Sequence, residues 1–338
     1  MKPSRPLATL FHPFESGAIA PPAAGRVLFL GAEPGLRLPE GFAADMHLVQ
    51  GFRPHFRALE ASGYAISPLP EGSGYDAALV LAGRHRGQNE DRIAEAAERV
   101  VPGGLILVAG SNEDGIGSLR KRVNKLAGTD DSLPKHHGVA FWFRRPVDAG
   151  ALVAALRSQP VLVDDCFTTA PGMFSHDHID AGSLLLAGCL PETAKGAAAD
   201  FGAGWGYLSA QLAERTRGLT QIDLYEADYE SLEAAKGNLA SRPVPPEFGF
   251  FWLDLIGEKV AKSYDLIVMN PPFHQGRAAE PGIGHAMVRA ASSALKPGGW
   301  LYMVANRGLP YGEVLKSSFA EVRELASEAG FRVTAARR

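Results

Sequence analysis

The sequence is organised around Tyr264-Asp-Leu-Ile-Val-Met-Asn270-Pro271-Pro272-Phe273-His274, a short apolar run that ends in two prolines. Residues 266–269 carry no charge, which is typical of a parallel strand buried on both faces. The prolines have no N–H to offer a sheet, so the strand ends before them. Open α/β sheets bind ligands at the carboxyl ends of their strands. We therefore expect Asn270, Pro271, Pro272 and Phe273 to form a ligand site.

These groups suit an amine attached to a flat ring. The lone pair of such an amine is delocalised into the ring, so the nitrogen must be reoriented before it attacks an electrophile. The side-chain oxygen of Asn270 and the carbonyl of Pro271 can each accept one N–H, and Phe273 can stack on the ring, a contact worth about 1–3 kcal/mol. The structural alternative is a strand-ending turn with a phenylalanine in the core.

Length and composition place the chain among globular α/β proteins. Its 338 residues allow two domains, and 46% are apolar. No stretch reaches the length of a membrane span, and the first ten residues lack the apolar core of a signal peptide. Cys166 and Cys189 are too few for a disulfide framework or a zinc site. We expect a cytoplasmic protein with no membrane segment.

The charge is unevenly distributed. The net charge of −3 argues against a protein that coats nucleic acid. Residues 1–160 nevertheless hold 18 Lys and Arg against 16 Asp and Glu, whereas the remainder holds 16 against 21. Such basic runs are either solvated faces or phosphate contacts. The clusters in the first half are Arg53/His55/Arg57, Arg84/His85/Arg86, Arg120/Lys121/Arg122/Lys125 and Arg144/Arg145.

The second half of the chain repeats the first. Three pairs of segments match in the same order: 29–35 with 200–206, 75–87 with 264–276, and 101–109 with 296–305. We predict two tandem Rossmann-like α/β domains from a duplication, spanning residues 1–147 and 148–338.

Each half contains strand and helix patterns. In the first half we expect strands at 26–30, 75–82, 105–109 and 137–145, and helices at 89–100 and 115–126. In the second half we expect strands at 222–225, 248–253, 266–269, 300–304 and 331–335, and helices at 184–190 and 229–239.

The first copy differs at the positions that carry chemistry. Leu81-Ala-Gly-Arg84 replaces the Asn-Pro-Pro-Phe segment, and Phe29 replaces Asp200. Glu33 replaces Gly204, which puts a carboxylate into the glycine turn. We predict that the first domain is a degenerate copy that serves as a scaffold or holds a large substrate.

A cofactor site is predicted at the start of the second copy. Gly202, Gly204 and Gly206 let the backbone pass close to a ligand between a strand and a helix. Glu226 ends the next strand, twenty residues after Gly206, where it can take a ribose diol. The dinucleotide-binding fingerprint has a glycine at the position of Tyr207 in this chain. The tyrosine therefore disfavours binding of a nicotinamide or flavin cofactor.

Two further polar groups have less specific patterns. Asp254 follows the predicted strand 248–253. It either accepts from an adenine amino group, or it caps a helix or lies in a solvated loop. The segment 171–183 contains His176, Asp177 and His178, whose side chains are of the types that bind metal ions. No further cluster completes a metal site, so we expect a loop that closes over a cofactor.

With these residues in place, the chain resembles the class I S-adenosylmethionine-dependent methyltransferases that act on exocyclic amines. More narrowly, its duplication, Asn-Pro-Pro-Phe-His at 270–274, the loop 174–183, and the segments 304–306 and 309–311 resemble the bacterial ribosomal RNA guanine-N2 methyltransferases of the small-subunit type. The resemblance implies that Asp200 and the three glycines hold the methionine part of the cofactor, Glu226 the ribose and Asp254 the adenine. Phe174, Asp180 and Ser183 would line the cofactor, and Asn270, Pro271, Pro272 and Phe273 would hold a flipped guanine.

The implied reaction transfers a methyl group from S-adenosylmethionine to N2 of a guanosine in 16S ribosomal RNA. The implied partner is ribosomal RNA or the small ribosomal subunit, and we expect a monomer without a metal. Three alternatives stay open: an enzyme acting on 23S ribosomal RNA, an enzyme acting on adenine N6 or a protein glutamine amide, and a non-catalytic RNA-binding assembly protein.

Overall fold

The described part of the chain contains two seven-stranded sheets whose strands follow equivalent orders. The computed structural model describes residues 3–240, 242, 246–272, 274–275, 278–279 and 281–338. Phe273, predicted to stack on the base, lies outside these residues. The chain divides into two compact units, 1–159 with 170–172, and 160–169 with 173–338.

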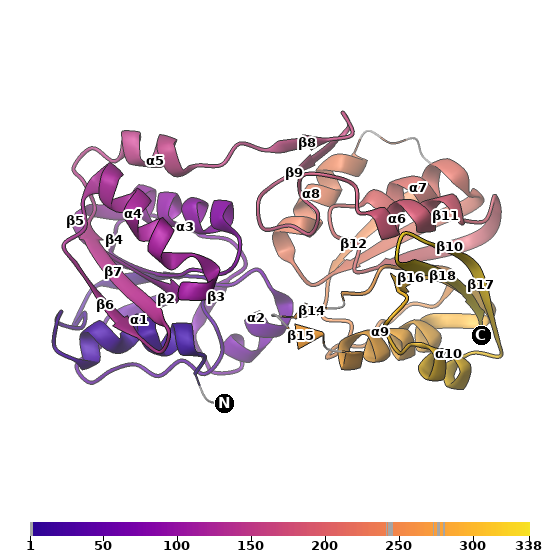
Figure 1. Ribbon diagram of the computed structural model, residues 1–338, viewed down its shortest axis with the longest axis horizontal. Coiled ribbons are helices and arrows are strands. Elements are labelled where there is room, and N and C mark those ends of the chain that lie inside the picture. The colour runs from indigo at the N-terminus through magenta and orange to yellow at the C-terminus, as the bar shows by residue number, and fades with distance from the viewer. Residues whose placement is uncertain (1–2, 241, 243–245, 273, 276–277, 280) are drawn as a thin grey trace. The chain divides into compact units, whose positions relative to one another are not determined.

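The first unit is a three-layer α/β fold (Figure 1). Its sheet has the order β3-β2-β1-β4-β5-β7-β6, parallel except for β7 and β6. One face carries α3, α4 and α5, and the other carries α1 and α2. The elements are α1 (Arg5–Glu15), β1 (Arg26–Leu30), β2 (Asp45–Val49), α2 (Arg53–Glu60), β3 (Ala65–Ser67), β4 (Tyr75–Leu81), α3 (Arg86–Arg99), β5 (Val100–Ser111), the 3-10 helix η1 (Asn112–Asp114), α4 (Ile116–Ala127), β6 (Asp131–Lys135), β7 (Gly138–Arg144) and α5 (Gly150–Leu156).

The second unit repeats the arrangement in the order β12-β11-β10-β13-β16-β18-β17, with β18 and β17 antiparallel. Helices α9 and α10 pack on one face, and α6, α7 and α8 contact strands of the same sheet. The elements are β8 (Val161–Val163), β9 (Phe167–Thr169), α6 (Ala181–Gly188), β10 (Thr193–Phe201), α7 (Tyr207–Arg215), β11 (Arg217–Glu226), α8 (Tyr229–Leu239), β12 (Glu247–Trp252), β13 (Tyr264–Met269), β14 (His274–Gln275), β15 (Ala278–Ala279), α9 (Pro281–Ala294), β16 (Leu295–Asn306), α10 (Gly312–Ser318), β17 (Glu321–Glu328) and β18 (Phe331–Arg337).

The duplication extends to a local contact at the start of the first central strand. In the first unit, Asp76 accepts the N–H of Arg26 at 2.7 Å, and in the second unit Asp265 accepts the N–H of Ala197 at 3.0 Å. Each carboxylate lies so close to the preceding glycine that a Cβ there would clash with it. Both glycines have a φ above +80°, so the same left-handed backbone conformation occurs in both units.

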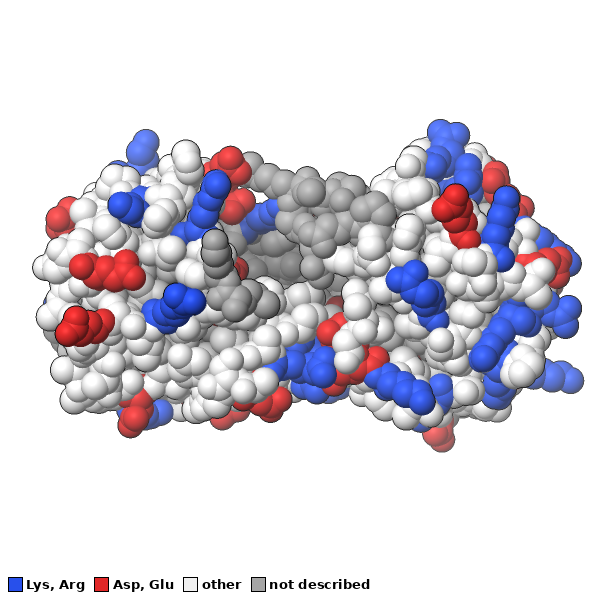
Figure 2. Space-filling model, turned by 90° about the horizontal axis from the view of Figure 1, so that it is seen from below, with Lys and Arg blue, Asp and Glu red and all other residues white. Residues whose placement is uncertain are grey.

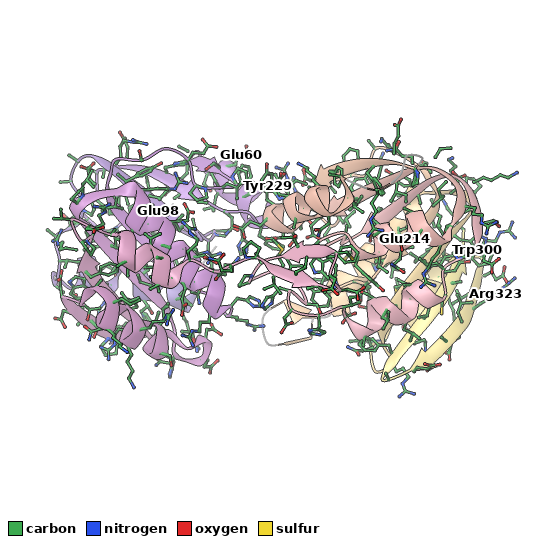
Figure 3. The ribbon with its side chains drawn as sticks, turned by 90° about the horizontal axis from the view of Figure 1, so that it is seen from above. Glu60, Glu98, Glu214, Tyr229, Trp300 and Arg323 are labelled. Carbon is green, nitrogen blue, oxygen red and sulfur yellow. The ribbon has the colours of Figure 1, made fainter. Side chains whose placement is uncertain are left out.

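The units divide later along the chain than the sequence predicts. We expected a boundary after residue 147, whereas the first unit continues to Gln159. Helix α5 packs against α3, and Arg157, just after α5, contacts Glu95 at 2.7 Å and Glu98 at 2.6 Å. Figure 3 labels Glu98 on α3. These ion pairs and the apolar face of α5 hold the segment to the first sheet.

Strand β18, predicted to close the second sheet, instead lies between β16 and β17. The edge strand β17 was not predicted. Its outer part is exposed and polar, with Arg323 5.4 Å above the ring of Trp300 on β16, and Figure 3 labels this pair. A strand of this composition lacks the apolar alternation by which a strand is recognised.

Candidate active site

The glycine turn joins β10 to α7. The N–H groups of Gly202 and Ala203 donate to the carbonyl of Tyr225 at 2.8 and 3.2 Å, which fixes the turn to the end of β11. Gly202, Gly204 and Gly206 have φ values of 77°, 53° and 91°, a region that side chains disfavour. A Cβ on Gly204 would meet no atom within 4 Å, so this part of the turn faces open space.

Two carboxyl groups, one buried and one partly buried, lie at this turn. Asp200 is fully buried at the end of β10, and its Oδ2 accepts the hydroxyl of Ser209 at 2.8 Å. Glu226 accepts the N–H groups of Gly204, Ala227 and Asp228, each at 2.8 Å. Both groups therefore end neighbouring strands at the edge of the turn.

Burial changes the protonation of this pair. It raises the pKa of Asp200 to about 7, and the charge of Glu226 adds to the shift. Burial also raises the pKa of Glu226 to about 7, against the three N–H groups that stabilise its charged form. Because Glu226 has these donors and keeps part of its side chain exposed, we assign the first proton of the pair to Asp200.

Asn270 directly follows β13, and its side chain is hydrogen-bonded to the start of helix α6. Its Nδ2 lies 2.9 Å from Oδ2 of Asp180 and 2.8 Å from Oγ of Ser183. Asp180 is also the N-cap of α6, where its Oδ2 accepts the N–H of Ser183 at 2.8 Å. Residues 87 and 90 positions apart in sequence thus meet at one point.

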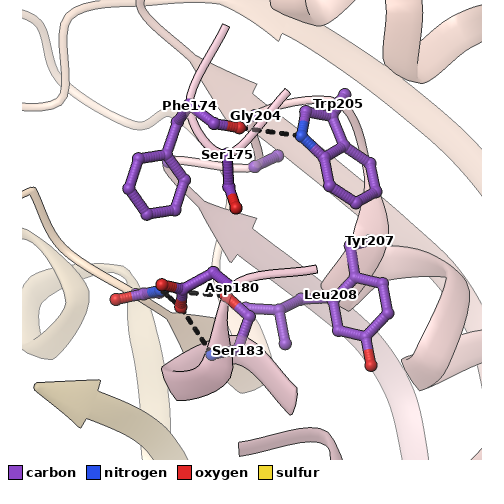
Figure 4. A pocket seen from close by; sticks show the side chains of 11 residues that line it. Phe174, Ser175, Asp180, Ser183, Gly204, Trp205, Tyr207 and Leu208 are labelled. Atoms are coloured by element: carbon purple, nitrogen blue, oxygen red, sulfur yellow. Dashed lines mark hydrogen bonds between the residues drawn. The ribbon is translucent and has the colours of Figure 1, made fainter. Parts of the chain in front are cut away.

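A small pocket, open to solvent, is formed by the glycine turn, the loop before α6 and Asn270 (Figure 4). Neither Asp200 nor Glu226 is among its lining residues. Of the predicted residues, the pocket is lined by Phe174, Asp180, Ser183, Gly202, Gly204 and Asn270, and it is also lined by Ser175, Ala203, Trp205, Tyr207 and Leu208.

Five of the lining residues were not predicted as site residues, and three of them have large side chains. Trp205 donates its Nε1–H to the carbonyl of Phe174 at 2.9 Å and so fastens the loop over the turn, as Figure 4 shows. Tyr207 and Leu208 begin α7 and line the pocket from below the turn. The sequence signal was present, because Trp205 stands between two glycines of the turn, but nothing in the pattern says that its ring N–H reaches the loop.

The remaining predicted residues lie around the pocket lining. Gly206 is the N-cap of α7 and lies against α8, where a Cβ would come within 3.2 Å of Ala235. Pro271 is buried and Pro272 is exposed, both directly after Asn270. Asp254 accepts the N–H of Ile256 at 3.0 Å. Its strand, β12, joins the site through the N–H of Leu253, which donates to the carbonyl of Glu226 at 2.9 Å.

The site has the donor and acceptor set for a cationic nucleoside cofactor. Oδ1 of Asp200 is buried and has no hydrogen-bond partner among the residues that the structure describes. A buried carboxylate oxygen of this kind costs free energy unless a ligand satisfies it, and an ammonium group would do so. Glu226 can accept ribose hydroxyls beside it. The residues therefore fit S-adenosylmethionine.

In the polar loop before α6, His178 contacts a neighbouring residue of the same loop. His178 Nδ1 lies 2.7 Å from Oδ1 of Asp177, and both side chains are exposed. The described part of the chain holds no group of three or more His, Cys, Asp or Glu side chains placed to bind a metal ion. Among the described helices, none is long and apolar enough to cross a membrane.

In the first unit the corresponding turn is closed by its own side chains. Gln50, which matches Glu226 in register, donates to the carbonyl of Ala32 at 2.5 Å. Glu33, in the position of Gly204, accepts the hydroxyl of Ser4 at 2.6 Å. Arg92 donates to the carbonyl of Leu81 at 2.9 Å and lies where a Cβ on the turn's first glycine would be.

Comparisons with known proteins agree with this geometry. The family described as "Methyltransferase small domain" matches residues 165–335. The chain is 30% identical to "Ribosomal RNA small subunit methyltransferase C" of Erwinia tasmaniensis over 246 residues, which are 68% of this chain and 66% of that protein. It is 28% identical to the protein of the same name from Idiomarina loihiensis over 307 residues, 88% of each chain. The alignment thus spans just under two thirds of the first relative and most of the second.

One solved structure resembles the whole chain. It is the T. thermophilus 16S rRNA N2 methyltransferase in complex with AdoMet and guanosine, with a TM-score of 0.79 and 24% identity, covering 98% of this chain and 91% of that one. This likeness extends over both units and confirms the predicted fold of two Rossmann-like domains. Since the family match covers half of the chain, including the glycine turn and Asn270, the chain belongs to the methyltransferase small domain family.

Proposed function

We propose that this protein transfers a methyl group from S-adenosylmethionine to N2 of a guanosine in 16S ribosomal RNA. The observation that carries the proposal is that Asn270 and the glycine turn line the same pocket. This arrangement supports the proposal because it would let one pocket hold both the cofactor and the amine that receives its methyl group.

The residues of the chain can position both reactants. Asp200 supplies a buried carboxylate for the ammonium end of the cofactor, and Glu226 supplies acceptors for the ribose hydroxyls. When bound, S-adenosylmethionine supplies a methyl group on a positively charged sulfur. Asn270 Oδ1 and the carbonyl of Pro271 would each accept one N–H of the guanine amine, which directs its lone pair at the methyl carbon.

The transfer needs no base on the protein. The N2–carbon bond forms as the carbon–sulfur bond breaks, the electron pair of that bond goes to sulfur, and the displaced N2 proton leaves to water. Catalysis would come from alignment of the two reactants, which is worth several kcal/mol in bimolecular reactions. Because N2 is stacked or paired in RNA, the guanine must be extruded first.

The choice of guanine and of the small subunit is supported by the relatives. The Erwinia and Idiomarina proteins are named for the small ribosomal subunit, and the T. thermophilus enzyme was solved with guanosine. Asn270 and the glycine turn, which line one pocket of this chain, support transfer to an amine. We accordingly place the protein in the cytoplasm, where it would meet ribosomal RNA.

The first unit would hold the RNA. Several of its basic residues are already committed within the unit: Arg86 and Arg122 contact Glu90 at 2.7 and 3.0 Å, and Arg145 donates to the carbonyl of Ala97 at 2.9 Å. On α4, Lys121 and Lys125 are both exposed one turn apart. Figure 2 shows Lys and Arg side chains on the surface of each unit. The exposed lysines of α4 are therefore the contacts that we assign to RNA phosphates.

The test is methyl transfer from labelled S-adenosylmethionine to naked 16S RNA, small subunits and large subunits from a strain that lacks this gene, followed by nucleoside mass spectrometry. We expect N2-methylguanosine in the small-subunit samples. Label in 23S RNA, in adenine or in protein would contradict the proposed substrate and identify the labelled molecule as the substrate instead. No label together with no cofactor binding would indicate an RNA-binding protein without this activity.

A further inference from the structure

Asn270 is connected to helix α6 by two hydrogen bonds that fix which way its amide faces. We propose that Asp180 and Ser183 are positioning residues that lock this amide so that Oδ1 is presented to the substrate amine. The inference rests on the methyltransferase function proposed above, and it assigns to the two residues a role beyond lining the cofactor.

The chemistry of the partners determines the orientation of the amide. Asp180 as a carboxylate can only accept hydrogen bonds, so the group 2.9 Å from its Oδ2 must be the NH₂ of Asn270. The second N–H has Oγ of Ser183 at 2.8 Å. If the amide were flipped, Oδ1 would face a carboxylate oxygen at the same distance, which is repulsive. Both donors are therefore used on the protein side.

Helix α6 is a firm platform for this pair. Asp180 caps its first turn through the N–H of Ser183, and Ser183 is buried. Gly182, between them, lies so close to β18 that a Cβ would come within 2.8 Å of the Phe331 ring. The cap and the close packing keep the carboxylate at one position relative to the sheet, and the sheet in turn positions Asn270.

The lock has a consequence for substrate choice. An unrestrained asparagine can turn either its oxygen or its NH₂ toward a ligand, and so accepts an amine or a carbonyl. With both N–H groups engaged, Asn270 offers only an acceptor, which selects a base edge that carries an amino group. Donation of its N–H groups to a carboxylate also polarises the amide and makes Oδ1 a stronger acceptor.

Three substitutions separate positioning from folding. Asp180→Ser keeps an N-cap acceptor for α6 but is too short to reach Asn270. Asp180→Asn keeps one oxygen that can serve both the Ser183 N–H and the Asn270 amide, and is the conservative variant. The double variant Asp180→Ser with Asn270→Ala asks whether Asp180 acts through Asn270.

The first readout needs no substrate. In ligand-free protein, the side-chain amide signals of Asn270 can be assigned by their loss in Asn270→Ala. We expect these protons to exchange with water slowly in wild type and at least about tenfold faster in Asp180→Ser, with Asp180→Asn near wild type. Equal exchange in wild type and Asp180→Ser would overturn the proposal.

The second readout is kinetic. We expect Asp180→Ser to lower kcat about 10- to 100-fold while the Kd for S-adenosylmethionine stays within about threefold, and Asp180→Asn to recover most of kcat. The double variant should be no slower than Asn270→Ala alone. Positioning through Asn270 would be refuted if the kcat losses of the two single variants multiplied in the double variant. It would also be refuted if Asp180→Ser weakened cofactor binding and left kcat unchanged. If wild type itself methylates no RNA, the proposed function fails, and the exchange measurement still decides whether the amide is locked.

Discussion

Glu226 accepts the backbone N–H of Gly204 at 2.8 Å, so the strand-end carboxylate and the centre of the glycine turn form one rigid unit. In the first unit Gln50 occupies the position of Glu226 and donates to the carbonyl of Ala32 instead. The carboxylate of Glu226 is therefore one difference between the two turns, together with Glu33 in the place of Gly204.

Glu226→Gln should weaken cofactor binding. An amide has one acceptor oxygen where the carboxylate has two, so either the backbone or the ribose diol loses its partner. We expect the Kd for S-adenosylmethionine to rise about 10- to 100-fold, the cost of one or two hydrogen bonds to a charged group. Isothermal titration calorimetry measures it. Glu247→Gln, at the exposed start of β12, is the matched control and should bind normally.

Cofactor affinity should rise with pH across neutrality. Burial raises the pKa of Asp200 and of Glu226 to about 7, so below this pH the ligand-free protein carries protons that must leave before a cationic cofactor binds. Each group can cost up to about tenfold in Kd per pH unit below its pKa.

The measurement is the Kd for S-adenosylmethionine between pH 6 and 8, together with proton release in buffers of different ionisation enthalpy. Asp200→Asn should bind more weakly at pH 8 and flatten the profile. A Kd independent of pH in wild type would show that the pair stays ionised in the free protein.

Gly204→Glu should abolish cofactor binding, since it places the carboxylate of the first unit's turn into the second. A Cβ at Gly204 has free space but a φ of 53°, so Gly204→Ala carries the backbone strain of about 1 kcal/mol without the charge. Gly237→Glu, at an exposed glycine of α8, adds the same charge away from the pocket.

We expect titration with S-adenosylmethionine to give no binding for Gly204→Glu, weakened binding for Gly204→Ala and normal binding for Gly237→Glu. Normal binding by Gly204→Glu would mean that the glutamate does not explain the degeneracy predicted for the first unit.

Asn270→Ala should separate binding from transfer. The side chain lines the pocket beside Asp180 and Ser183, whereas the proposed cofactor contacts are Asp200 and Glu226, so cofactor affinity should remain close to wild type. The loss of one oriented acceptor should lower kcat about 10²- to 10³-fold, as for other preorganised polar groups. Single-turnover methyl transfer measures the chemical step. Unchanged turnover would remove Asn270 from the reaction.

Reversing the exposed charges of α4 should weaken RNA binding without touching the cofactor site. Lys121→Glu with Lys125→Glu should reduce affinity for 16S RNA and lower the slope of log K against log salt concentration by about two. Filter binding at several salt concentrations tests this, with the S-adenosylmethionine Kd as the control. An unchanged salt slope would assign the RNA contacts to other residues.

Much of the fold follows from local patterns. Helix α8 begins and ends where the sequence predicts, and β13 stops at Asn270 because proline follows. The matching segments of the two halves also predicted equivalent sheets, since the same turns and apolar runs must bury the same faces. Edge strands such as β6 and β17 escaped prediction because their pairing is imposed by a neighbouring strand and not by apolar alternation.

The sequence by itself determined which residues could carry the chemistry: the glycine turn, the acid at the end of β11 and Asn270 before the prolines, each a property of a short segment. Only the tertiary structure decided how they act. It buried Asp200 and left its Oδ1 without a hydrogen-bond partner among the described residues. It also fastened Phe174 to Trp205 and brought Asp180 to Asn270 across 90 residues. Contacts of this kind depend on which strands and helices pack together, and that packing is a property of the whole chain.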